Sequence, residues 1–329
     1  MSSGEAATER SGVGAFYRLG GFLQRNLHNI GMPVAVLLLC ILFSVASEYF
    51  LTVQNLRNVG LQAAALAAVA LGQTLVVLTG GLDLSVGSVV ALVSVVAALA
   101  MIAFGVPAGI LAGLAAGAAV GVVNGIVVTR LRVFPFIATL AMLSIAAGLA
   151  LNISGGTPIA GVPRDFALIA WTRVGGVPVP LLISLTLLGL VFLFLRYHRI
   201  GRDIYAVGGN PQAARLSGIA TNRAVVTAYT LSALCAAVGS LILTARVGSG
   251  QPTLGTSLPL ESVAAVVLGG VSLFGGRGSV LNVAMGVAFV SVLSNGLNLL
   301  NVSSYTQMMV IGLALILAVA LDRRFAIRE

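Results

Sequence analysis

The chain has 329 residues, of which 58% are hydrophobic and only 8% are charged. Soluble domains usually carry about 25% charged residues, so this composition cannot build a surface that faces water throughout. The mean hydropathy of +1.07 and the long runs without charge predict an integral membrane protein. They exclude an ordinary soluble enzyme, a secreted disulfide scaffold and a disordered chain.

Charged residues divide the chain into apolar stretches that are long enough for spanning helices. A helix crosses the hydrocarbon core with about 20 residues. Counting the stretches predicts an all-α, polytopic transmembrane bundle of about ten spans. In chain order they are Ile30–Leu51, Asn58–Leu82, Leu84–Thr129 with two spans, Val133–Pro163, Val174–Leu195, Ala224–Ala245, a short helix beginning near Pro259 and ending before Gly276, and Gly278–Leu321 with two spans.

The arginines predict the orientation of these spans, because cytoplasmic loops retain positive charge. With the N-terminus inside, 14 of the 18 basic residues are cytoplasmic, and Arg57, Arg164, Arg173 and Arg246 lie outside. We therefore expect a multi-pass protein of the inner (plasma) membrane with both termini in the cytoplasm. Residues 1–28 form a partly disordered cytoplasmic segment, 29–322 the membrane domain and 323–329 a cytoplasmic tail. The net charge of +9 is thus a topology signal, and nucleic acid is not expected as a partner.

Glycine recurs at every fourth position of one stretch, at Gly109, Gly113, Gly117 and Gly121. This spacing places all four on one face of a helix. Small residues let membrane helices approach closely, so the pattern predicts a tight seam between helices. A smooth face lining a pathway is the alternative.

Asp83 stands between two apolar stretches, within the segment Thr79–Ser88. Glycines on both sides break the helix, and the carboxylate can cap the helix that follows. An acidic residue inside a span costs about 2.5–3.5 kcal/mol, so a role in gating or solute passage stays open beside the cap. Glu261 follows Pro259 at the start of a helix, where a carboxylate suits the positive end of the dipole.

Amide side chains also occur in otherwise apolar stretches, and in lipid they must face the bundle interior or a water-filled path. Hydrogen bonds between helices explain any one of them, and together they indicate an interior that can pass an uncharged hydrophilic solute. They are Gln73, Asn124, Asn152, Asn282, Asn295, Asn298 and Gln307. The candidate translocation path or gate comprises Asp83, Ser85, Gln73, Asn124, Asn295 and Asn298.

The loop 196–223 carries five arginines and one acid, Asp203. Within it Asn210 can cap a helix, Pro211 suits the first turn and Gly218 suits a left-handed end, which predicts one short helix, Pro211–Ser217. Such a loop either holds anionic lipid headgroups or docks a cytoplasmic partner. For docking, the candidate residues are Arg202, Asn210, Ala213, Ala214, Arg215 and Gly218.

Several motifs follow one another along the chain and together carry a family resemblance. One of them, Gly201–Pro211 followed by Ala213–Ile219, resembles the coupling loop of the permease subunits of ribose-type ABC importers, and Gln212 stands where the general importer motif has glutamate. The segment Thr79–Ser88 resembles their first-half signature. Further matches are Gln251–Thr253, Ala265–Gly270, Gly275–Gly276 and Asn295–Leu300, so the resemblance covers the chain from about residue 50 to residue 322.

The resemblance implies a type II-like permease that passes a monosaccharide and is not an enzyme. It also implies a second permease copy, a cytoplasmic ABC ATPase and a periplasmic sugar-binding protein as partners, beside membrane lipid. The residues agree in part: a chain without lysine cannot supply a phosphate-loop lysine, so ATP is used by another polypeptide and no cofactor is expected here. No catalytic triad or metal cluster is expected either.

Two other classes stay open at this point. A secondary transporter driven by an ion gradient would use Asp83 and Glu261 as its candidate ion-binding residues. A passive channel would conduct without any partner.

Overall fold

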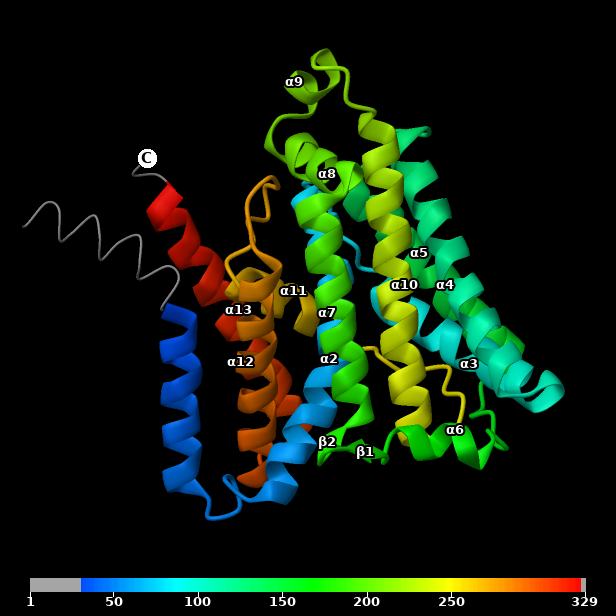
Figure 1. The fold of residues 1–329 in the computed structure, drawn as a ribbon, viewed down its shortest axis with the longest axis vertical. Coiled ribbons are helices and arrows are strands. Elements are labelled where there is room, and N and C mark those ends of the chain that lie inside the picture. The colour runs from blue at the N-terminus through cyan, green and yellow to red at the C-terminus, as the bar shows by residue number, and fades with distance from the viewer. Residues whose placement is uncertain (1–30, 327–329) are drawn as a thin grey trace, which may run out of the picture.

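A computed structural model describes residues 31–326, with side chains as far as residue 317. The only sheet in this part of the chain is a hairpin of β1 (Arg173–Val174) and β2 (Val177–Pro178). Within residues 31–326, seven helices are long and apolar enough to span a membrane (Figure 1). They are α2 (Val53–Leu78), α3 (Val86–Phe104), α4 (Val106–Thr129), α5 (Pro135–Ser154), α7 (Val179–Tyr197), α10 (Thr221–Val247) and α12 (Val280–Leu299).

Three shorter apolar helices fall where the remaining spans were expected: Gly31–Ala46, α11 (Leu258–Leu268) and the apolar part of α13 (Ser304–Ala326), Ser304–Leu317. With 11 residues, α11 is about 16 Å long, roughly half of the hydrocarbon core. The prediction of about ten spans is therefore supported for seven of them. The predicted disordered segment 1–28 lies outside the described residues.

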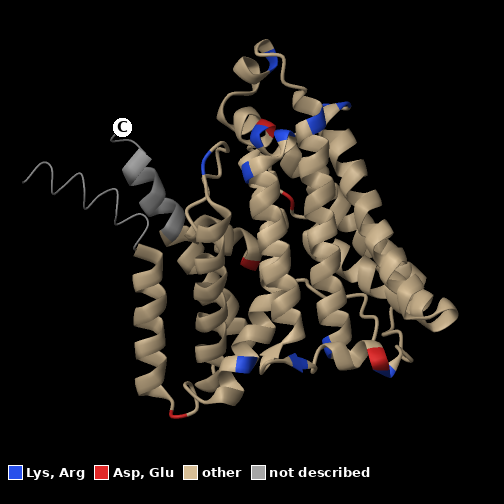
Figure 2. Cartoon of the chain, viewed as in Figure 1, with Lys and Arg blue, Asp and Glu red and all other residues tan. Residues whose placement is uncertain are grey.

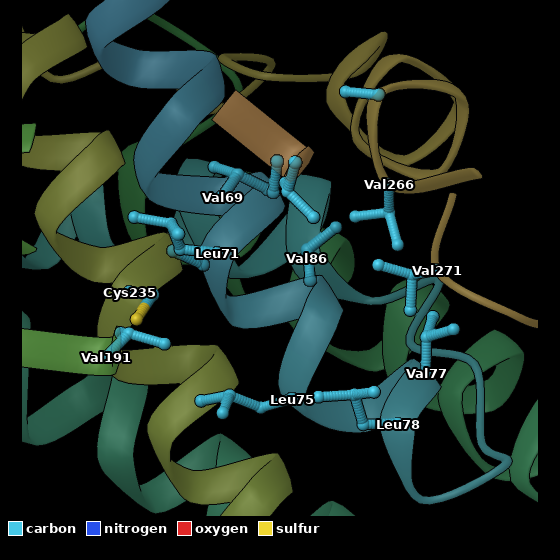
Figure 3. Packing of buried hydrophobic residues seen from close by; sticks show 14 of the residues in the cluster. Val69, Leu71, Leu75, Val77, Leu78, Val86, Val191, Cys235, Val266 and Val271 are labelled. Atoms are coloured by element: carbon cyan, nitrogen blue, oxygen red, sulfur yellow. The ribbon is translucent and has the colours of Figure 1, made fainter. Parts of the chain in front are cut away.

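The core of the bundle is built around α2, whose buried residues run continuously from Ala68 to Leu78. α2 packs against α7, α10, α11 and α12, while α3 packs against α4, α5 and α10. Figure 3 shows the valine and leucine side chains that fill the space around α2. A helix that is surrounded on all sides needs apolar residues on every face. The buried run of α2 from Ala68 to Leu78 has them, with Gln73 and Thr74 as its polar residues.

The glycine stripe of α4 forms the predicted seam, and it faces two partners in turn. A Cβ atom at Gly109 would overlap Met101 of α3, whereas one at Gly121 would lie 2.6 Å from the backbone oxygen of Tyr229 on α10. Gly125 extends the stripe, since a Cβ atom there would lie only 2.7 Å from the Cα atom of Val226 on α10. Without side chains at these positions, α4 can cross from α3 to α10 in direct backbone contact.

The two ends of the bundle differ in structure. At one end lie α8 (Arg199–Gly209) and α9 (Pro211–Leu216), close to the end of α2. At the other end lie the β1–β2 hairpin and α6 (Arg164–Ile169). The arginines gather at these two ends and are absent from the middle of the described bundle (Figure 2).

Candidate functional site

Between α2 and α3 the chain turns back into the bundle without forming a helix. α2 ends at Leu78, Gly80 adopts a φ of +80° that favours glycine, and α3 begins only at Val86. The chain then turns back along α2, so that Asp83 lies beside Gln73, a residue more than one turn before the end of that helix. Residues 79–85, called here the re-entrant segment, therefore lie inside the protein.

Asp83 organises this segment through its side chain, which is only 1% exposed. Its Oδ1 atom accepts hydrogen bonds from the backbone N–H of Ser85 at 3.0 Å and from the Ser85 hydroxyl at 2.6 Å. Its Oδ2 atom accepts from Ser232 of α10 at 3.5 Å. The N-cap residue of α3 is Ser85, and no side chain makes a capping hydrogen bond to this helix, so the predicted cap by Asp83 is not formed. The carboxylate instead closes a turn with Ser85 just before α3 and contacts a second helix, α10.

Other side chains satisfy the backbone of the re-entrant segment. With its amide oriented to suit its neighbours, Gln73 donates to the Asp83 carbonyl at 3.0 Å and accepts from the Asp83 N–H at 3.3 Å. The Leu82 carbonyl accepts from Thr139 at 3.1 Å and from Tyr229 at 3.5 Å. Non-helical backbone is tolerated inside a membrane protein only where such partners replace water.

Four of the six candidate path residues meet in this cluster: Gln73, Asp83, Ser85 and Asn124. Asn124 of α4 donates to the Ser85 hydroxyl at 2.9 Å, and its Oδ1 atom is buried without a partner. Sequence reasoning missed three further members, Thr139, Tyr229 and Ser232. Nothing in their local sequence distinguishes them from ordinary polar residues of a helix, and only the packing of α5 and α10 brings them here.

The other two candidates lie elsewhere. Asn295 exchanges two hydrogen bonds of 2.9 Å with Asn55, at the opposite end of α2 and about 27 Å from Gln73 along that helix. Asn298 is exposed. Asn55 and Asn295 thus form a hydrogen-bonded pair between two helices, which is the structural role that the sequence left open for any one of the amides.

Glu261 lies in the first turn of α11, as predicted, and its side chain is half-buried. The remaining amides contribute less to the interior. Asn152 is exposed, Asn282 is half-buried, and Gln307 donates to the Val302 carbonyl at 2.9 Å.

The loop 196–223 contains the predicted helix as α9, capped as expected. The Asn210 side chain accepts from the N–H groups of Gln212 and Ala213 at 3.0 and 2.9 Å, and Gly218 has a φ of +79°. The loop also contains α8, a second helix that the sequence analysis did not predict. The sequence pattern could have predicted α8, because Gly201, Ile204 and Val207 recur at helical spacing and form the buried face of this helix.

The two candidate alanines of α9 differ in their surroundings. Ala213 is exposed, whereas Ala214 is only 5% exposed and packs into the core of this chain. Leu216 is the apolar side chain that α9 presents, with 90% of its surface exposed. A single exposed leucine does not by itself mark an interface, but Leu216 is the large apolar side chain that α9 offers to any partner at this end.

α8 connects this loop to the re-entrant segment. A Cβ atom at Gly208 would overlap the Leu78 carbonyl at the end of α2, and Gly276 lies against Gly208 and Gly209. The Gly276 N–H also donates to the Leu78 carbonyl at 3.0 Å. Backbone from three parts of the chain is therefore in direct contact where the re-entrant segment begins.

A tyrosine fixes α8 in this position. The Tyr205 hydroxyl donates to the Gly278 carbonyl at 3.1 Å, before α12 begins. Burial raises the pKa of Tyr205, so the hydroxyl stays protonated and remains a donor. Arg202 and Arg215 are both exposed at this end of the molecule.

These features define the chain as a multi-pass membrane protein with a buried polar cluster and a structured loop at one end. The chain belongs to the family described as branched-chain amino acid transport system / permease component, whose model matches residues 55–319. Family membership makes it a transport component and not an enzyme. The resemblance to importer permeases drawn from the motifs is confirmed.

Its relatives include permeases named for sugars. The ribose import permease of Escherichia coli K12 is 43% identical over 300 residues, which cover 88% of this chain and 92% of the relative. The D-allose transport system permease of the same organism is 35% identical, with 88% and 90% covered. A probable ABC transporter permease from that organism is 38% identical, with 91% and 90% covered. No solved structure matches the chain.

Proposed function

We propose that this chain is the permease subunit of an ABC importer and passes a monosaccharide across the inner membrane. A separate ATPase would supply the energy, a periplasmic sugar-binding protein would deliver the solute, and a second copy would complete the channel. The relatives named for ribose and allose support the solute class, and the one named as an ABC transporter permease supports the energy source.

The contact between the loop and the re-entrant segment is the observation that carries this proposal. Leu216 offers an apolar contact to a cytoplasmic partner, and the α9 that bears it follows directly on α8. α8 in turn touches the end of α2 at Leu78, where the re-entrant segment begins. A movement imposed on α9 by an ATPase would therefore reach the residues around Asp83 through contacts between backbones, which deform little.

Ten crossings with both termini in the cytoplasm remain our proposal for the topology. Gly250 pairs with Ile159 at the end of the molecule where α10 finishes, and Gly276 lies at the other end beside Leu78. The chain must cross the bundle between these two points. α11 and the non-helical residues that flank it supply this crossing as a broken span. Together with the seven long helices and the two other short apolar helices, this gives ten crossings, an even number that puts both termini on the same side.

We further propose that the cluster of Gln73, Asp83, Ser85 and Asn124 acts as the gate. Such clusters bind solutes or ions where helices are broken near the middle of a membrane protein. Asn295 and Asn298, which are far from it, would then act outside the gate. On the outer end, Arg57 and Arg173 line one shallow hollow and offer positive charge to the binding protein.

Uptake by reconstituted vesicles tests the solute class. The permease, its ATPase and its binding protein would be placed in proteoliposomes with ATP inside, and radiolabelled ribose and leucine would be offered separately. We expect ribose to accumulate and leucine to stay at the level of empty vesicles. Accumulation of leucine without ribose would contradict a sugar permease, because the family description also covers amino acid systems.

A further inference from the structure

An apolar groove opens between α7 and α10 on the side of the bundle. Both helices pack against α2, and Leu75 of α2 lies at the bottom of the groove beside Cys235 of α10. Figure 3 shows Cys235 next to Val191 of α7, which closes the bottom from the other side. The groove has a volume of about 360 Å³ and no polar atom contributes to its surface.

The groove is elongated along the helices. Its lining on α7 extends from Leu187 to Phe194, about 10 Å along the helix axis. Leu190 forms part of its rim and is 59% exposed. In a membrane such a surface faces acyl chains, and a single chain lying lengthwise fits its shape and its lack of polar groups.

Positive charge gathers at the cytoplasmic end of the bundle, beyond the last groove residues, Phe194 of α7 and Leu231 of α10. α8 lies across this end in contact with both α7 and α10 (Figure 1). Arg196, Arg199, Arg202 and Arg223 are exposed on these three elements, and Asp203 is the only acid among the described residues there. Arginines at the membrane surface attract the headgroups of anionic lipids.

The same charges disfavour a second copy of this chain as the occupant. Its side chains would have to bring acidic groups to the four arginines. Apart from Asp203, the acids with described side chains are Asp83, which is buried, Glu261, which lies on α11, and Glu48 and Asp165, which lie outside this end. Two copies meeting here would set arginine against arginine.

We propose that one anionic phospholipid occupies this site, with an acyl chain in the groove and its phosphate on the arginines of α7, α8 and α10. The site adjoins the coupling loop, because Phe194 of the groove stacks on His198 with ring centres 5.2 Å apart. His198 in turn caps α8 by accepting from the Ile200 N–H at 3.2 Å. The lipid would thus contact the element that carries α9, whether or not the solute is a sugar.

A tryptophan placed at the rim tests the proposal. The only native tryptophan, Trp171, is replaced by phenylalanine, and Leu190→Trp is introduced and reconstituted in vesicles. Fluorescence quenching is compared between brominated phosphatidylglycerol and brominated phosphatidylcholine at equal mole fraction. We expect phosphatidylglycerol to quench at least about twofold more strongly. Leu185→Trp, also on α7 but outside the groove, is the control and should show no preference.

The arginines are tested in the same assay. Arg196→Gln, Arg199→Gln and Arg223→Gln together should abolish the preference at position 190. Arg130→Gln, Arg132→Gln and Arg215→Gln, three exposed arginines elsewhere at this end, should leave it intact. Equal quenching by both lipids at position 190 would mean that the groove holds bulk lipid without selection for anionic headgroups, and this result would overturn the proposal. Quenching at position 185 but not at 190 would mean that protein covers the groove, which would overturn it equally.

Discussion

Asp83 illustrates how a single buried carboxylate can shape a membrane protein. Its oxygens receive hydrogen bonds from the backbone and hydroxyl of Ser85 and from the hydroxyl of Ser232. The backbone N–H and C=O of Asp83 itself pair with the Gln73 amide. One residue thus joins α2, α3 and α10, because water is not available to satisfy any of these groups.

Replacing Asp83 separates the effect of its hydrogen bonds from the effect of its charge. Asp83→Asn keeps an oxygen that can accept from the Ser85 N–H, so we expect nearly normal abundance in the membrane but uptake per permease reduced several-fold. Asp83→Ala removes all three side-chain hydrogen bonds and leaves buried donors of Ser85 and Ser232 without a partner, at a cost of about 1–3 kcal/mol for each such donor, and should lower abundance as well. Quantitative immunoblots and uptake assays measure both effects. Normal uptake per permease in Asp83→Asn would leave the residue with a structural role only.

At the scale of elements, the glycine stripe of α4 makes a prediction about packing. A methyl group at Gly121 would press on the Tyr229 carbonyl, so we expect Gly121→Ala to destabilise the bundle by about 1–3 kcal/mol. Gly148 of α5 has no neighbour within 4 Å, and Gly148→Ala should leave stability unchanged or raise it by up to about 1 kcal/mol. Thermal unfolding in detergent compares the two. If Gly121→Ala melts at or above the temperature of Gly148→Ala, the seam is not tightly packed.

α9 makes a prediction about partner binding. Burying a leucine contributes about 1.5–3 kcal/mol, and an unpaired charge in its place adds a penalty. We therefore expect Leu216→Asp to reduce co-purification of the ATPase about tenfold or more, with unchanged thermal stability of the permease. Uptake should fall in parallel.

Gln212→Ala serves as the matched control, since Gln212 is also exposed on α9. Ala214→Asp is not a clean test, because a charge at this buried position would disturb the loop itself. Full retention of the ATPase by Leu216→Asp would remove α9 as the docking element.

At the scale of the whole molecule, the sequence predicted what depends on composition and local chemistry. Apolar stretches located the helices, and Asn210 and Gly218 located the ends of α9, because capping follows from neighbouring residues. The contact of Gly208 with Leu78 could not be predicted, since these residues are far apart in the chain. The burial of Ala214 was missed for the same reason: it depends on how α9 folds back onto the bundle.

The topology gives a prediction that labelling can check. Thr157 lies beyond α5 near the end that holds the hairpin, and Ser217 follows α9 at the opposite end; both are exposed. Single cysteines at these positions, in a background lacking Cys40 and Cys235, should react with a membrane-impermeant maleimide from opposite sides. We expect Thr157→Cys to be labelled in intact cells and Ser217→Cys only after permeabilisation. Labelling of both in intact cells would contradict the orientation.

The energy source of transport tests the central claim most directly. Proteoliposomes containing the permease, its ATPase and its binding protein would be loaded with ATP or a non-hydrolysable analogue, and ribose uptake would be measured with and without ionophores that collapse ion gradients. The account predicts uptake that requires hydrolysable ATP and is unchanged by the ionophores. Uptake that persists with the analogue and disappears with the ionophores would contradict it, and would favour a gradient-driven transporter that uses Asp83 and Glu261.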